Sequence, residues 1–398
     1  MTEKLFEDNS LLRVCTAEVT SCLQVAGEYL IELDRTVFFP EGGGQLSDQG
    51  FLDDLAVQHV STREGRIYHH CAQPLEVGAK VMAQLNWPLR LDRMQQHCGE
   101  HLFSWACWKL FDAHNVGFHM HEDWVAIDLD KQLTMEQLYE AELLTNQLIW
   151  ENRPITVRYV DSREAATLPG MRKFNEKLEG LLRIVSVEGA DVCTCCGTHP
   201  PATGMVGSVQ LVKAEKHKQG IRVEFLCGQR ALLAHRAQNQ ALLALGNKFS
   251  VKPLEVPVRI EKLTATLEEL QERLKQQTLQ LLTAQLQERY QQAPKRRDGV
   301  RVVTLVSEEA QAAKLLSSTI EGLEQAIVLV INPQAQRLSY LLALGKNTVG
   351  DCRSYSKLLN EALDGRGGGK PHSAQGGAPY CEDWEARLQG VVETLLNE

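Results

Sequence analysis

The sequence predicts an α+β protein of several successive units, because the pattern of apolar residues changes three times along its 398 residues. A β-barrel-like N-terminal domain is expected over residues 1–90, followed by a mixed α/β domain over 91–235. A helical, coiled-coil-like linker over 236–294 then leads into a C-terminal α/β domain over 295–398. A chain of this length ordinarily folds as two or three domains, and a hydrophobic content of 43% is enough to form their cores.

The first ninety residues are expected to form strands. Short apolar runs such as EYLIEL and RTVFFP are separated by glycine and aspartate, which favour turns. Within this region TVFFPEGGGQLSDQG occupies residues 36–50. Its three consecutive glycines allow a tight turn and a close approach of the backbone to a ligand. Gln45 and Asp48 supply polar groups beside that turn, although a plain β-turn explains the same residues.

The second unit is expected to combine helices and strands. LDRMQQHCGEHLFSWACWKLF, which starts at Leu91, repeats apolar residues at intervals of three and four, the period of an amphipathic helix. A second such helix covers residues 134–152, and Pro154 follows it. The run ITVRYV then reads as a strand, and residues 181–226 form a further β-rich stretch.

The linker carries a heptad pattern. One seam position repeats every seven residues and the other follows it by three: Ile260, Leu267, Leu274 and Leu281, with Leu263, Leu270, Gln277 and Ala284. A helical hairpin between two domains is the favoured interpretation, and an amphipathic helix lying on a core is the alternative. Pro294 ends the segment.

The last hundred residues are expected to form a layered domain. RVVTLV, AIVLVI and YLLALG have the apolar character of buried strands, and EEAQAAKLLSSTIEG between the first two is typical of a helix. The glycine-rich stretch GRGGGKPHSAQGG spans residues 365–377, and a helix through WEARLQGVVETLL closes the chain.

Charge and cysteine content narrow the function classes. The formal net charge of −9 lacks the basic surplus of most nucleic-acid binders, so any RNA contact would depend on local basic patches. No run of about eighteen apolar residues and no secretory signal occurs, and a cytoplasmic location is expected. The chain has eleven cysteines, and disulfide bonds are a poor explanation for them in a reducing cytosol. We therefore look for cysteines whose spacing is typical of metal ligands.

A histidine pair lies on the first predicted helix of the second unit. His97 and His101 in HCGEH are four residues apart, so both imidazoles lie on one helix face, where they could share a metal ion. An ordinary polar helix face is the alternative. Glu100 precedes the second histidine rather than following the first, so the metalloprotease motif HExxH is absent.

A second group of possible ligands follows about a hundred residues later, in DVCTCCGTHP. Cys195 and His199 are four residues apart around a Gly-Thr turn, and they could complete a site of three nitrogens and one sulfur. Zinc favours imidazole and thiolate ligands of this kind. Cys193 and Cys196 compete with Cys195 for the thiolate role, and the residue pattern alone leaves that choice open.

Three elements, TVFFPEGGGQLSDQG, HCGEHLFSWA and CCGTHPPATGMVG, occur in this order. Together they resemble the editing domain of alanyl-tRNA synthetases and its freestanding relatives, the AlaX-type alanyl-tRNA editing proteins. The resemblance covers about residues 1–235. It implies that Thr36 and Gln45 are catalytic-pocket residues near the aminoacyl group. It also implies one zinc ion per chain, held by four residues: His97, His101, Cys195 and His199.

The resemblance continues near the C-terminus. GRGGGKPHSAQGG is similar to the glycine-rich end of the C-terminal tRNA-binding domain of the same synthetases, and the helical linker before it indicates the long AlaX type. Arg366 and Lys370 are expected to bind tRNA, since the surrounding glycines permit close approach of a phosphate. A surface loop with incidental charge is the alternative. A homodimer formed through the C-terminal half is one assembly that this arrangement allows.

The motifs also depart from the family pattern. Cys98 and Glu100 fill HCGEH where a Thr-Ala-Gln-like filling is usual, and Cys196 stands where glycine is common. Pro200 follows His199 where an aliphatic residue is usual. A cysteine in place of glycine requires a backbone angle that a non-glycine residue can adopt. These departures bear on the shape of the pocket and on the rate.

The resemblance implies a trans-editing hydrolase that deacylates mischarged tRNA(Ala), above all Ser-tRNA(Ala). The pocket that attaches alanine to tRNA cannot strongly reject serine, which merely adds a hydroxyl; the discrimination between the two is on the order of a hundredfold. A second, hydrolytic site is therefore needed. Thr36 is expected to accept the serine hydroxyl. Zinc would activate water or polarise the carbonyl, or with four protein ligands mainly orient the substrate. The alternative function is a catalytically weak tRNA-binding module or synthetase partner.

Overall fold

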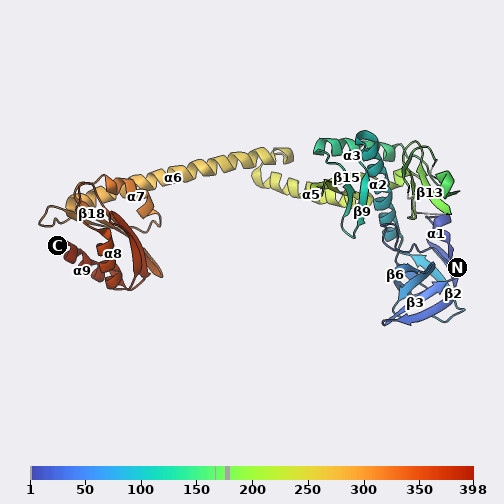
Figure 1. Ribbon diagram of the computed structural model, residues 1–398, viewed down its shortest axis with the longest axis horizontal. Coiled ribbons are helices and arrows are strands. Elements are labelled where there is room, and N and C mark those ends of the chain that lie inside the picture. Colours follow the sequence, from blue (N-terminus) through green and yellow to red (C-terminus); the bar gives the residue numbers. More distant parts are fainter. Residues whose placement is uncertain (1, 166, 175–179) are drawn as a thin grey trace. The chain divides into compact units, whose positions relative to one another are not determined.

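The computed structural model describes residues 2–165, 167–174 and 180–398. The chain divides into two compact units, an N-terminal unit, Met1–Ala244, and a C-terminal unit, Leu245–Glu398 (Figure 1). Each unit combines helices with at least one β-sheet, so the predicted α+β class is confirmed. The finer division into four domains stays a prediction. No helix among the described residues is long and apolar enough to cross a membrane.

A closed barrel opens the N-terminal unit, as the strand pattern predicts. Its strands run in the order β2 (Val14–Val25), β3 (Glu28–Leu33), β7 (Arg66–Cys71), β6 (Leu55–Arg63), β5 (Gly50–Leu52) and β8 (Lys80–Leu85). All these pairings are antiparallel. Along β8 every second side chain is buried, which is the alternation expected when one face of a strand lines a core. The short strands β1 (Glu3–Lys4) and β4 (Arg35–Thr36) pair in parallel beside helix α1 (Leu5–Asp8).

The long helix α2 (Trp87–Phe111) follows the barrel. The Asn86 side chain accepts a hydrogen bond from the Leu89 N–H, and proline stands in the first turn, where its missing N–H costs nothing. Asp112 ends the helix in the left-handed conformation. Helix α3 (Met135–Trp150) begins at Thr134, which forms a capping box with Gln137. Both helices therefore begin at caps that are visible in the sequence.

Two four-stranded sheets belong to the same part of the N-terminal unit. The first has the order β15 (Val209–His217), β16 (Gly220–Cys227), β10 (Val125–Leu129) and β9 (Asn115–Met120). The second has the order β11 (Ile155–Asp161), β13 (Leu181–Val187), β14 (Val192–Thr194) and β12 (Met171–Lys173). The short helices α4 (Ser162–Ala165) and η1 (Thr203–Val206) complete this part. Side chains from α2, α3 and the strands form its common core, in which Leu102, Phe103 and Phe225 are fully buried.

The predicted helical linker is present as α5 (Gly228–Phe249) and α6 (Val256–Gln292), with η2 (Pro253–Glu255) between them. Near its end α6 packs on the core of the C-terminal unit through Leu282 and Leu286, which is the packing expected of the amphipathic-helix alternative. The preceding apolar seam of α6 is exposed in the described chain: Ile260, Leu263, Leu267, Leu270, Leu274 and Leu281.

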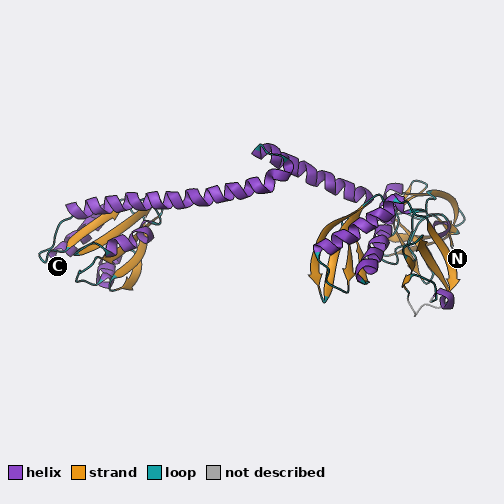
Figure 2. Cartoon of the chain, turned by 90° about the horizontal axis from the view of Figure 1, so that it is seen from above, coloured by secondary structure: helices purple, strands orange, loops and turns teal. Residues whose placement is uncertain are grey.

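The C-terminal unit contains a five-stranded sheet (Figure 2). Its order is β17 (Arg301–Val306), β18 (Ala326–Gln334), β19 (Arg337–Leu344), β21 (Ser373–Pro379) and β20 (Arg366–Lys370). The helices are α7 (Ala312–Glu321), α8 (Cys352–Leu363) and α9 (Trp384–Asn397). The glycine-rich stretch is an antiparallel strand pair, β20–β21, rather than a surface loop. Helix α8 was not predicted, although Asp351 caps it and its buried Tyr355, Leu359 and Leu363 have helical spacing.

Candidate metal centre

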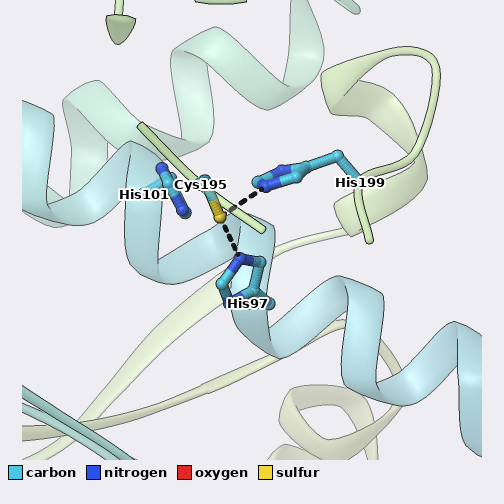
Figure 3. Close-up of side chains that lie close together, drawn as sticks. All are labelled: His97, His101, Cys195 and His199. Carbon is cyan, nitrogen blue, oxygen red and sulfur yellow. Dashed lines mark hydrogen bonds between the residues drawn. The ribbon is translucent and has the colours of Figure 1, made fainter. Parts of the chain in front are cut away.

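Four side chains from two distant parts of the sequence converge in the N-terminal unit (Figure 3). The potential ligand atoms of His97, His101, Cys195 and His199 all lie within 4.8 Å of one another. The Cys195 sulfur is 3.0 Å from His97 Nε2 and 3.4 Å from His199 Nε2. The three histidines are buried and Cys195 is partly buried.

Helix α2 presents the two histidines of HCGEH on one face, with ring centroids 4.9 Å apart. His101 Nδ1 donates a hydrogen bond of 2.9 Å to the carboxylate of Asp191, which leaves Nε2 for the cluster. Arg172 holds the same carboxylate with two bonds, of 2.6 and 2.9 Å. A buried carboxylate that orients an imidazole in this way is the usual support of a metal-binding histidine.

The loop after β14, called the ligand loop below, carries Cys195 and His199. Arg183 donates from Nη1 to the backbone carbonyls of Cys195 and Gly197, at 2.8 and 2.9 Å. Gln45 lies in the glycine loop, residues 36–50, and forms two hydrogen bonds with Thr198. Its amide nitrogen donates to the Thr198 hydroxyl at 2.8 Å, and its Oε1 accepts from the Thr198 backbone N–H at 2.9 Å. The barrel and the ligand loop are therefore joined directly beside His199.

Glycine is required at position 197. A Cβ atom there would lie 2.5 Å from His97 Nε2 and 2.7 Å from Gln45 Oε1, closer than real Cβ atoms approach their neighbours. A larger residue would displace either a cluster imidazole or the amide that holds the loop.

The four side chains lie close enough together, and carry the right donor atoms, to hold a metal ion. Zinc–nitrogen and zinc–sulfur bonds of about 2.0–2.3 Å place neighbouring tetrahedral ligands about 3.4 Å apart, close to the sulfur–nitrogen distances found here. Burial by itself would raise the pKa of the Cys195 thiol, but the three histidines lower it well below its ordinary value. The cluster thus offers the thiolate and imidazole donors that a metal ion binds.

The competing cysteines lie elsewhere. The Cys193 sulfur lies 3.1 Å from His101 Nδ1, on the side of the imidazole that Asp191 occupies. Cys196 is exposed. Of these three cysteines, Cys195 is therefore the one whose sulfur lies among the three histidines.

The unusual filling of HCGEH lies outside the cluster. Cys98 is fully buried in the apolar core. One oxygen of Glu100 accepts hydrogen bonds from Ser104 at 2.8 Å and from Asn115 at 2.6 Å. Its other oxygen is 3.8 Å from His101 Nε2. Cys196 does not have the positive φ that would strain a non-glycine residue.

Thr36 and Gln45 are both fully buried. The Thr36 hydroxyl accepts a hydrogen bond of 3.1 Å from the Phe38 N–H and lies 2.8 Å from His69 Nε2. His69 Nδ1 lies 3.0 Å from the Ile31 carbonyl, to which it must donate. Nε2 is therefore the acceptor, and Thr36 donates to it. Contact of Thr36 and Gln45 with an aminoacyl group stays a prediction.

The two basic residues predicted to bind tRNA lie in the C-terminal unit. Arg366 and Lys370 are the first and last residues of β20 and are exposed. Arg366 also lines a cavity of about 810 Å³, together with Lys314, Arg337 and His372. Their contact with tRNA stays a prediction.

Sequence reasoning missed the residues that support the cluster. Asp191, Arg172 and Arg183 make the contacts described above, yet only Asp191 stands next to a recognised motif, at the start of DVCTCC. The strand pairing of β13 and β14 brings Arg183 to the ligand loop, and nothing in the local sequence indicates that pairing.

Residues 182–224 match the family "Threonyl and Alanyl tRNA synthetase second additional domain". The chain is 29% identical to "Alanyl-tRNA editing protein AlaX-L" of Pyrococcus horikoshii, over 67% of each chain. It is 28% identical to "Alanyl-tRNA editing protein Aarsd1" of Rattus norvegicus, over 99% of each chain. "Alanine--tRNA ligase" of Pyrococcus abyssi is 25% identical over 99% of this chain but only 44% of its own length, so the chain spans less than half of that relative.

The solved C-Ala domain of Aquifex aeolicus alanyl-tRNA synthetase matches 26% of this chain and 96% of its own, with 15% identity and a TM-score of 0.23. The chain is therefore similar over nearly its whole length to alanyl-tRNA editing proteins, and it is similar to alanine–tRNA ligases over less than half of their length.

Proposed function

We propose that this protein is a trans-editing hydrolase that deacylates mischarged tRNA(Ala), with Ser-tRNA(Ala) as its substrate and one zinc ion as its cofactor. The observation that supports this most strongly is the convergence of His97, His101, Cys195 and His199. The eleven free cysteines suit a protein that acts in the reducing cytoplasm.

The residues of the chain divide the work. His97, His101, Cys195 and His199 would hold the zinc ion. When bound, zinc supplies a positive charge that polarises an ester carbonyl or fixes the position of the substrate. Asp191 keeps the His101 imidazole oriented, and Gln45 holds the ligand loop against the barrel. Burial of these groups keeps bulk solvent away from them, which strengthens each electrostatic interaction in the site.

Hydrolysis of Ser-tRNA(Ala) and Ala-tRNA(Ala) tests this proposal, with and without a zinc chelator. We expect rapid loss of serine that the chelator abolishes, while alanine is largely retained. Cys195→Ala should lose both zinc and activity, and Cys196→Ala is the matched control because its thiol is exposed. Binding of tRNA without hydrolysis of either ester would instead support a catalytically weak binding module.

We further propose that the C-terminal unit binds the body of the tRNA through Arg366 and Lys370. Both side chains are exposed and their backbone is flanked by glycine, so a phosphate can approach closely. Replacing both with glutamine should weaken binding of tRNA(Ala) and reduce its dependence on salt. Lys357→Gln, an exposed change on α8, is the control. Unchanged affinity in the double variant would refute this assignment.

We propose a homodimer formed through the C-terminal half, because α6 exposes a continuous apolar seam along several turns. Leu267 and Leu274 are 56% and 65% exposed. Sedimentation of the wild type should give twice the mass of one chain, and replacing both leucines with glutamine should give the monomer. A wild-type monomer at high concentration would exclude the dimer.

A further inference from the structure

Arg93 is a buried cation without a hydrogen-bond partner for two of its nitrogens. It lies on α2, one helical turn before His97, and the residue is only 4% exposed. Its Nε and Nη1 atoms are buried with no partner among the described residues. Leaving a buried guanidinium unpaired is costly, so a protein retains one mainly where an anion completes the site.

The nearest carboxylates are already committed to other arginines. Asp48 accepts hydrogen bonds from Arg90, and both oxygens of Asp92 are held by Arg230, at 2.8 and 2.6 Å. Arg93 is thus the third arginine beside two buried or half-buried carboxylates. The other carboxylates that line the adjoining cavities, Glu41 and Glu122, are exposed and make no hydrogen bond to the two unpaired nitrogens of Arg93.

Arg93 borders two cavities, of about 280 and 230 Å³. Leu46, Gln49 and Glu122 also line both of them, so the cavities lie between α2, the glycine loop and the residues after β9. Glu122 is exposed and therefore able to turn into solvent when an anion enters. Arg93 is the buried cation that lines both cavities.

We propose that Arg93 binds the phosphate of the terminal nucleotide at the 3′ end of the substrate RNA, and so places the ester beside the metal centre. This inference rests on the proposed function. Arg93 and His97 are four residues apart on one helix, or about 6 Å along its axis. In a charged tRNA a single ribose separates the ester from the nearest phosphate, and this separation is comparable with the distance between the two residues along the helix. The guanidinium offers the planar, two-pronged donor that fits phosphate oxygens.

The test compares two non-hydrolysable probes by titration calorimetry on the full-length protein. Both are adenosine with serine attached through an amide at the 3′ position, and only one carries a 5′-phosphate. In the wild type the phosphate should raise affinity about tenfold or more, the usual effect of hydrogen bonds to a charged group. In Arg93→Gln the two probes should bind equally, whereas Lys109→Gln, at an exposed position of the same helix, should keep the preference.

The outcomes separate this inference from the proposed function. If the wild type binds both probes equally, or if Arg93→Gln keeps the preference, the assignment of Arg93 is wrong and the editing function stands. If the wild type binds neither probe, the proposed function fails with it.

A second measurement detects a merely structural arginine. Without RNA, Arg93→Met should raise Tm, since it removes an unpaired buried charge and keeps the apolar part of the side chain. A lower Tm would show that Arg93 stabilises the fold and would overturn the inference.

Discussion

The hydrogen bond between Asp191 and His101 offers the sharpest test of the metal centre. Asp191→Asn keeps the size of the side chain and removes its charge. Asp191 now accepts one bond from His101 and two from Arg172, and it is 1% exposed. The asparagine still offers one oxygen to His101, but its amide group cannot accept from Arg172.

The expected magnitude follows from these contacts. Loss of the carboxylate that orients a metal-binding histidine typically lowers metal affinity about 10–100-fold, or about 1.4–2.7 kcal/mol. The variant also leaves the buried guanidinium of Arg172 without its carboxylate, which should lower the free energy of unfolding by about 3–5 kcal/mol. Replacing Arg172 with methionine in addition should restore much of the stability and leave the zinc affinity low.

Zinc affinity is measured by competition with a chromophoric chelator, and stability by urea unfolding of the metal-free protein. Asp130→Asn, an exposed change in the same unit, is the control. If Asp191→Asn bound zinc as tightly as the wild type, Asp191 would have no role in orienting His101. If the double variant regained both stability and zinc affinity, the single variant's metal defect would be a consequence of unfolding.

Three further predictions follow from buried contacts. Gly197→Ala should abolish zinc binding measured by metal analysis, because its Cβ would collide with His97 and Gln45; a fully loaded variant would contradict the loop geometry. Burial lowers the pKa of His69 to about 4 from 6.5. As the pH falls below 6.5, His69 therefore becomes protonated in the unfolded chain, whereas in the folded protein it stays neutral down to about pH 4. The free energy of unfolding should fall by about 3 kcal/mol between pH 6.5 and pH 4. Urea unfolding should show a shallower loss for His69→Gln, and an identical slope would refute this. Thr36→Val should lower the free energy of unfolding by about 1–3 kcal/mol, whereas Thr36→Ser should not; equal stability would contradict the bonds drawn for Thr36.

The sequence predicts those parts of the fold that depend on local patterns. The alternating strands of the barrel, the helix through HCGEH and the capped start of α3 at Thr134 all rest on residues close together in the chain. Helix α8 was missed although Asp351 and its apolar spacing mark it. The glycine-rich stretch has a low intrinsic propensity for strands, so its sequence does not predict one. Its strand conformation is instead stabilised by the pairing of β20 with β21.

The candidate site follows the same division. The spacing within HCGEH and within CTCCGTH is local, and it suffices to nominate two pairs of ligands. Contacts between distant segments decide the rest. Arg172 lies 19 residues before Asp191, and Gln45 reaches Thr198 across 153 residues. The residue spacing leaves the choice between Cys193 and Cys195 open and the family resemblance favours Cys195, whose sulfur lies among the three histidines in the folded chain.

The bonds of Thr36 also limit how it could recognise serine. Its hydrogen is donated to His69 Nε2, and the depressed pKa of His69 keeps that ring neutral near pH 7, so the direction of the bond is fixed. One lone pair of the Thr36 oxygen accepts from the Phe38 N–H. The remaining lone pair can only accept, and a serine hydroxyl would therefore have to donate to it. Because Thr36 is fully covered, this contact also requires neighbouring side chains to move. A side chain without a donor, such as that of alanine, would gain nothing from the same movement, and that difference is what an editing pocket needs to spare the correct ester.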